Sequence, residues 1–232
     1  MSDHLSKQFD LELEHIRTRI LQMGGLVERQ LLAAIEAFST GQLEAMQQVI
    51  DTDREVDAHQ VAIDEACTLL IARRQPTARD LRLVMAISRI VTDLERSGDK
   101  AAKIANMSRR LQRAGSQRVP RLSDIHHCGR LATDMLQSAL DSLARMDVDA
   151  ARQVIGADKA LDDAFNAILR QLITYMMEDP RTITEALDII WIAKAIERVG
   201  DHAANIAENV IYIVSGVDVR HTAAPAKSLE QA

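Results

Sequence analysis

The amino-acid sequence predicts an all-α protein made of two tandem homologous three-helix bundles. Apolar residues recur every three or four positions along most of the 232-residue chain, as they do on the buried face of an amphipathic helix. Only 4 Pro and 9 Gly interrupt the chain, and an aromatic content of 3% leaves the core to aliphatic side chains. A segment of eleven residues also occurs twice, at residues 95–105 and 197–207.

The first half contains three helical patterns. The first pattern covers residues 11–39 and stops before Gly41, which breaks the periodicity. The second covers residues 43–74 and stops before Pro76. Because proline is well tolerated in the first turn of a helix, we expect Pro76 to begin the third helix, which fades near residue 113.

The second half repeats this plan. Helical patterns cover residues 122–145, 148–177 and 179–215, and Gly216 ends the last of them. The final residues have no periodic apolar face, which is typical of a flexible tail. We therefore predict a first repeat at residues 1–114, a second at residues 115–216 and a tail at residues 217–232.

The repeated segment indicates a duplication. Residues 95–105 and 197–207 align without a gap and are identical at all but three positions. Both copies carry a glycine, Gly98 and Gly200, inside a predicted helix, at a cost of about 1 kcal/mol relative to alanine. Close packing of a neighbouring helix would explain a glycine that occurs in both copies, and close approach of a ligand to the backbone is the alternative.

An acidic pair precedes each copy of the segment. Asp53 and Asp57 lie 23 and 19 residues before Pro76, and Asp99 and Glu95 lie 23 and 19 residues after it. In an antiparallel hairpin that turns at Pro76, equal separations place residues at the same height, because each residue adds about 1.5 Å. Carboxylates four residues apart also share a helix face. If the helix phases agree, these four carboxylates form one patch.

The second half has the same mirror arrangement. Asp158 pairs with Asp201, and Asp162 with Glu197, about a centre between Asp179 and Pro180. A patch of four carboxylates is suited to hard or borderline cations, and several metal ions with bridging waters would neutralise it. The alternative interpretation is two solvated acidic stripes whose repulsion is screened by salt.

Composition excludes some functions and sets the expected compartment. A net charge of −6 and a pI near 5.7 argue against direct binding of nucleic acid. The first residues lack the layout of a signal peptide, no apolar stretch reaches spanning length, and we expect a cytoplasmic protein. Cys67 and Cys128 lie inside helical patterns without metal-ligand spacing, so we interpret both as buried or half-buried thiols.

The chain resembles the PhoU family, the bacterial regulatory proteins of phosphate uptake, from about residue 9 to residue 214. The resemblance rests on the pattern Glu-Arg-x-Gly-Asp-x-Ala at residues 95–101 and 197–203, on Asp-His-Ala-Ala-Asn-Ile-Ala-Glu at residues 201–208, and on the upstream acidic pairs. It implies two three-helix bundles side by side, a homodimer in many members, and a multinuclear cluster of iron or zinc in each half. The implied metal ligands are Asp53, Asp57, Glu95, Asp99, Asp158, Asp162, Glu197 and Asp201.

The resemblance also implies a function. Members of the family act as cytoplasmic adaptors, reaching the membrane only through their partners, the ATPase of the phosphate ABC transporter and the phosphate-sensing histidine kinase. At sufficient phosphate they negatively regulate the phosphate-starvation (Pho) regulon and restrain uptake. We expect this chain to do the same.

Two departures from the family pattern lie in the first half. Ser97 stands where an aliphatic residue is usual, and Lys103 replaces the asparagine found at Asn205. Because Lys103 is four residues beyond Asp99, it could pair with that carboxylate and compete with a cation. We therefore predict fuller metal occupancy in the second half. His202 follows Asp201 and could add a nitrogen ligand, or it could be a surface residue or the partner of a ligand.

Two other function classes remain as alternatives. A ferritin-like, carboxylate-bridged metal enzyme would need two Glu-x-x-His pairs, and the chain has such a pair at Glu12 and His15 without a counterpart in the second half. The chain also has no phosphate-binding glycine loop, nucleophile elbow or zinc-protease helix. We therefore expect no enzymatic activity. A helical scaffold without metal is the remaining alternative, if the acidic patches are only solvated.

Overall fold

The computed structural model describes residues 2–115, 119 and 123–219, and these residues form long helices. One short 3₁₀ turn, η1 (Pro180–Thr182), precedes the last helix. The six α-helices are α1 (Ser2–Thr40), α2 (Leu43–Arg74), α3 (Ala78–Ala114), α4 (Ser123–Arg145), α5 (Val148–Glu178) and α6 (Ile183–Ser215). The all-α prediction is confirmed.

Three predicted boundaries differ from the structure. Helix α1 begins at Ser2 and not near residue 11, because the apolar periodicity predicts only the part of a helix that packs against a core. Helix α3 begins at Ala78, so Pro76 lies in the connection before it. The third helix of the second half begins with η1, and regular α-helix starts only at Ile183. Most of the predicted tail, residues 220–232, lies outside the described residues.

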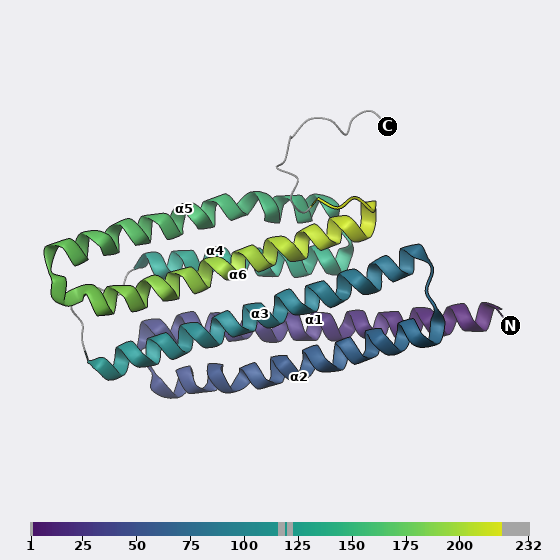
Figure 1. Cartoon of the computed structure of the whole chain (residues 1–232), viewed down its shortest axis with the longest axis horizontal. Coiled ribbons are helices and arrows are strands. Elements are labelled where there is room, and N and C mark those ends of the chain that lie inside the picture. Colours follow the sequence, from purple (N-terminus) through teal and green to yellow (C-terminus); the bar gives the residue numbers. More distant parts are fainter. Residues whose placement is uncertain (1, 116–118, 120–122, 220–232) are drawn as a thin grey trace, which may run out of the picture.

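The helices form two three-helix bundles that lie side by side, as predicted. Helices α1, α2 and α3 make one bundle, and α4, α5 and α6 make the other (Figure 1). The bundles meet where α3 packs along α6 and α1 packs on α4. Contacts between α3 and α6 show that these two helices are antiparallel: Asp93 meets His202, Lys103 meets Trp191, and Arg110 meets Asp188. The two halves are therefore related by an approximate twofold axis.

The cores are aliphatic, as the composition predicts. In α1 the buried stripe includes Ile16, Ile20 and Met23, each no more than 2% exposed. Both thiols lie in these cores, and the prediction of buried cysteines is confirmed. Burial raises the pKa of Cys67 to about 11 and that of Cys128 to about 12, because a thiolate is poorly solvated there.

Two tight hairpin turns set the height of the acidic pairs. Between α2 and α3 the chain reverses within residues 75–77, and the backbone N–H of Gln75 donates to the carbonyl of Ile71 at 3.1 Å. Between α5 and α6, the carboxylate of Asp179 accepts a hydrogen bond from the backbone N–H of Arg181 at 3.0 Å. These turns lie at the two positions about which the acidic pairs are mirrored in the sequence.

Candidate functional site

The first acidic cluster lies between α2 and α3. Asp53 and Asp57 are one turn apart on α2, and Glu95 and Asp99 are one turn apart on α3. Burial raises the pKa of Glu95, and the charges of Asp99, Asp57 and Asp53 raise it further, while Arg96 lowers it. Because these electrostatic effects require proximity, the structure brings the four predicted residues of the first half together.

The amide of Gln30 lies beneath this cluster. Its Nε2 donates to Oδ1 of Asp53 at 3.3 Å and to the carbonyl of Val49 at 3.1 Å. Burial raises the pKa of Asp53, the hydrogen bond from Gln30 lowers it, and the charges of Asp99 and Asp57 raise it. The Oε1 atom of Gln30 is buried and has no partner among the described residues. Sequence reasoning missed Gln30, although it is a polar residue on the apolar stripe of α1.

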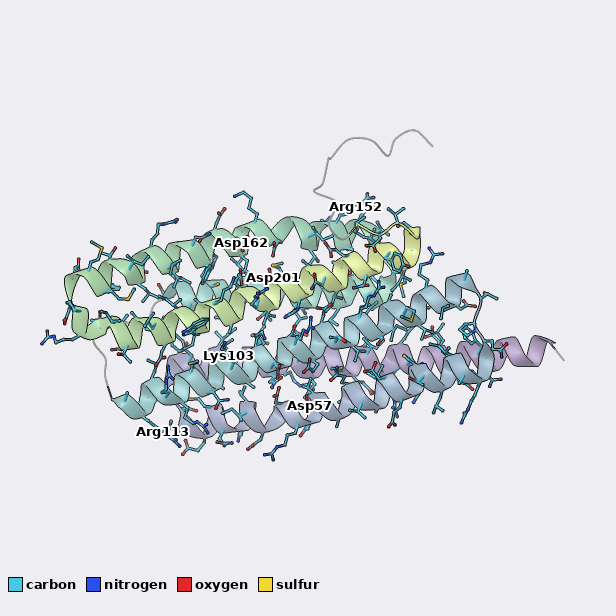
Figure 2. All side chains as sticks on the ribbon, in the orientation of Figure 1. Asp57, Lys103, Arg113, Arg152, Asp162 and Asp201 are labelled. Carbon is cyan, nitrogen blue, oxygen red and sulfur yellow. The ribbon has the colours of Figure 1, made fainter. Side chains whose placement is uncertain are left out.

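The second acidic cluster lies between α5 and α6. Burial raises the pKa of Asp158, and the charges of Asp162, Asp201 and Glu197 raise it further. Asp162 on α5 and Asp201 on α6 are close in Figure 2, whereas Asp57 marks the first cluster on the other bundle. The four predicted residues of the second half are thus also brought together.

Cations of the chain itself neutralise part of the second cluster. Lys194 forms an ion pair with Glu197, whose side chain is 9% exposed and whose Oε2 is buried without a partner among the described residues. Arg198 pairs with Asp201 at 3.1 Å, three residues along the same face of α6. Sequence reasoning missed Lys194, although its position three residues before Glu197 is a signal for such a pair.

The two motif glycines allow close helix packing. A Cβ on Gly98 would lie 3.1 Å from Gln30 Oε1 and from Val56. A Cβ on Gly200 would lie 2.1 Å from a methyl group of Leu161. Both glycines therefore let the motif helix approach its neighbours, as the repeated glycine predicted.

Three of the residues that differ between the motif copies make contacts between α3 and α6. The ammonium of Lys103 lies 5.1 Å from the ring centroid of Trp191 and forms no ion pair with a described carboxylate. His202 is 8% exposed, and its Nδ1 lies 3.0 Å from Asp93 Oδ1 on α3. The amide of Asn205 donates to the same oxygen at 3.1 Å. His202 is therefore buried between the two bundles and is not directed at the second acidic cluster.

The donor set fits metal ions, with one requirement. Each cluster offers four carboxylates whose mutual repulsion a cation would relieve, and the unpartnered Glu197 Oε2 is a free donor in the second cluster. Among the described residues, however, no group of three or more Asp, Glu, His or Cys side chains already encloses a position for an ion. Carboxylate side chains would have to change rotamer to bind one.

Comparisons with known proteins agree with this architecture. The profile of the PhoU domain matches the chain twice, at residues 20–108 and 125–210. A phosphate-specific transport system accessory protein PhoU homolog from Pseudomonas aeruginosa is 46% identical over 222 residues, which cover 95% of this chain and 91% of the relative.

Two crystal structures have the same fold. PhoU from Pseudomonas aeruginosa superimposes with a TM-score of 0.86 at 46% identity, over 90% of this chain and all of that one. The phosphate transport system regulatory protein PhoU from Streptococcus pneumoniae superimposes with a TM-score of 0.84 at 29% identity, over 91% and 99% of the two chains. With a duplicated domain, matching acidic clusters and close relatives over nearly its whole length, the chain belongs to the PhoU family.

Proposed function

We propose that the protein is a regulatory adaptor of phosphate transport. The observation that carries this proposal is its 46% identity, over 95% of the chain, to a protein named as an accessory of a phosphate-specific transport system. None of the described helices combines the length and apolar character that a membrane span requires. The adaptor works in the cytoplasm, as a homodimer, through contacts with the transporter ATPase and the phosphate-sensing histidine kinase. At sufficient phosphate it represses the phosphate-starvation regulon and restrains uptake.

We further propose that each acidic cluster binds a multinuclear metal centre of iron or zinc. The raised pKa values of Glu95, Asp53 and Asp158 support this, because they result from partial burial and, in addition, from the charges of the neighbouring carboxylates. The ligands would be Asp53, Asp57, Glu95 and Asp99 in one half and Asp158, Asp162, Glu197 and Asp201 in the other. Bound metal would join α2 to α3 and α5 to α6 and fix the surface that the partners recognise.

A reporter assay tests the regulatory proposal. Deletion of the gene should derepress a phosphate-starvation promoter at high phosphate, and the wild-type chain should restore repression. If the promoter stays repressed in the deletion strain, the regulatory proposal is wrong. A second strain with Asp99→Asn and Asp201→Asn then asks whether repression needs the metal ligands.

Elemental analysis tests the metal proposal separately. Protein purified without chelator should contain iron or zinc in stoichiometric amounts. Absence of every transition metal from such protein would remove the metal centres and leave the adaptor proposal standing. The same samples, analysed by sedimentation, test the homodimer.

A further inference from the structure

One buried amide at the first acidic cluster has an oxygen without a partner. Gln30 lies on α1 and is 3% exposed, so its polar atoms are shielded from solvent. Its Nε2 donates hydrogen bonds to the carboxylate of Asp53 and to the carbonyl of Val49, whereas Oε1 has no partner among the described residues. A buried oxygen without a partner is rare and costly in a folded protein. A group that the helices themselves do not supply would stabilise it.

The unpartnered oxygen and a carboxylate oxygen of the first cluster converge on one point. A β-carbon on Gly98 would lie 3.1 Å from Gln30 Oε1 and 3.4 Å from Asp53 Oδ1. Both atoms are acceptors when the carboxylate is ionised, so neither can satisfy the other. Their repulsion favours a cation beside them over an empty site.

The second half has apolar side chains at the corresponding place. A β-carbon on Gly200 would lie 2.1 Å from a methyl group of Leu161 and 3.5 Å from the sulfur of Met135. These two residues correspond to Val56 and Gln30, and both lie 105 residues further along the chain. Met135 and Leu161 are buried like their counterparts. The amide oxygen is therefore a feature of the first cluster, which the second cluster does not share.

We propose that the amide oxygen of Gln30 is a ligand of the metal centre in the first half, in addition to the four carboxylates. This inference rests on the proposed metal centres and adds a ligand that distinguishes the two halves. Amide carbonyl oxygens of glutamine are ordinary ligands of hard divalent cations. Because Nε2 of Gln30 is hydrogen-bonded to Asp53, the amide and this carboxylate are already oriented together before a cation binds.

A purely structural role of Gln30 is the alternative. In that role the N–H groups orient Asp53 and bind the carbonyl of Val49, and a water molecule that takes no part in metal binding satisfies Oε1. The two roles use opposite ends of the amide. Substitution separates them, because glutamate keeps an oxygen and loses the N–H donors, whereas methionine loses both.

A titration with Mn²⁺ alone compares these substitutions. Metal-free, full-length protein would carry Asp162→Asn and Asp201→Asn, so that calorimetry reports on the first half. Gln30→Met should then weaken Mn²⁺ binding by about tenfold. Gln30→Glu should bind Mn²⁺ at least as tightly as the parent chain, because the oxygen ligand is kept and gains charge. Met135→Leu is the matched control at the corresponding position of α4, and it should change the affinity by less than about twofold.

A spectroscopic measurement on the unsubstituted Gln30 does not depend on the stability of any variant. Protein labelled with ¹³C at the side-chain carbonyl of glutamine would be loaded with Mn²⁺ and analysed by electron–nuclear double resonance. We expect a hyperfine coupling typical of a carbon whose oxygen is bound to the metal. This coupling should disappear in Gln30→Met and remain in Met135→Leu.

Three outcomes would overturn the proposal. If Gln30→Glu and Gln30→Met, both helical by circular dichroism, weaken binding equally, the N–H groups matter and the oxygen is not a ligand. If Mn²⁺ binds without the ¹³C coupling, the amide is not a ligand and the proposed metal centre stands. If the first half binds no Mn²⁺, the amide ligand is wrong, and elemental analysis decides separately whether the chain holds iron or zinc.

Discussion

In the first acidic cluster, an amide from Gln30 lies beneath Asp53, and no ion pair among the described residues involves the four carboxylates. In the second, Met135 takes the corresponding place beside Gly200, and Lys194 and Arg198 pair with two of the carboxylates. The acidic positions were thus preserved after duplication while their surroundings diverged. The first cluster keeps its charge for an external cation, and the second already contains internal counterions.

This comparison changes the expected order of metal occupancy. The sequence predicted a fuller second half because Lys103 could pair with Asp99, but Lys103 lies over Trp191. Since Lys194 and Arg198 instead compete for ligands of the second cluster, we now expect the first cluster to be fuller.

Asp99→Asn and Asp201→Asn give the largest expected effect. Each should weaken metal binding in its own half by about 10- to 100-fold, because a ligating charge is lost while its shape is kept. Elemental analysis should find less metal left in Asp99→Asn than in Asp201→Asn. Equal metal content in the two variants would contradict the difference between the clusters, and the opposite order would restore the sequence-based prediction.

Lys194→Met sharpens the comparison by removing the internal counterion. Without Lys194, the charge of the buried Glu197 has no counterion. The free energy of unfolding of the metal-free protein should therefore fall by about 1–3 kcal/mol. Metal affinity of the second cluster should rise at the same time, because no ammonium has to be displaced. Thr92→Met, at the corresponding position of α3, is the control. Urea unfolding with and without metal measures both effects. Equal changes in the free energy of unfolding for Lys194→Met and Thr92→Met would show that the ion pair contributes nothing to stability or to metal affinity.

Gly200→Ala and Gly98→Ala compare helix packing in the two halves. At Gly200 the added methyl group would overlap a methyl group of the fully buried Leu161, so we expect a net loss of about 1–2 kcal/mol. At Gly98 the contacts of 3.1 Å require a smaller shift, and the gain in helix propensity offsets most of it. Thermal unfolding would distinguish the variants, and a more stable Gly200→Ala protein would show that Leu161 moves aside freely.

The pH dependence of stability gives the smallest expected effect, because the carboxylates are partly exposed and water screens them. The folded-state pKa values of Asp53, Glu95 and Asp158 are raised above their ordinary values of 3.8 and 4.5, so the folded state binds protons more readily than the unfolded state. These groups should therefore add stability to metal-free protein as the pH falls through the raised pKa values, and the gain should be complete only below the ordinary values of 3.8 and 4.5.

Gln30→Met makes the first cluster resemble the second and should steepen this pH dependence, because the amide that lowers the pKa of Asp53 is lost. Denaturant unfolding at several pH values measures the slope. Asp53→Asn with Glu95→Gln should flatten it. Two results together would contradict the crowding of the first cluster. The free energy of unfolding of the metal-free protein would fall steadily below neutral pH, and its slope against pH would be the same in these variants as in the wild type.

Much of the architecture could be predicted from local signals. Helix periodicity and the turns near Pro76 and Asp179 predict the number and the approximate bounds of the helices. The equal spacing of Asp53 and Asp99 about Pro76 predicts that these carboxylates lie at the same height along the hairpin. The rotation of each helix about its axis could not be predicted, because it depends on how Gly98 and its neighbours pack.

Contacts between the halves were beyond sequence reasoning. Sequence spacing places Lys103 near Asp99 on one helix, but the packing of α3 on α6 directs it to Trp191. The same packing buries His202 against Asp93, 109 residues away in the chain. The orientation of a side chain at such an interface depends on a neighbouring helix that local sequence patterns do not identify.

The antiparallel packing of α3 on α6 also bears on the origin of the protein. Two separate, identical three-helix chains could form this interface as a symmetric dimer, but every substitution would then occur on both sides of the axis. A single chain that carries both halves is free of that constraint. Asp93 could acquire His202 as its partner while the symmetry-related positions became Ala195 and Lys100. The hydrogen bond between Asp93 and His202 therefore has no symmetry-related copy, which a duplicated single chain permits and a symmetric dimer of identical chains does not.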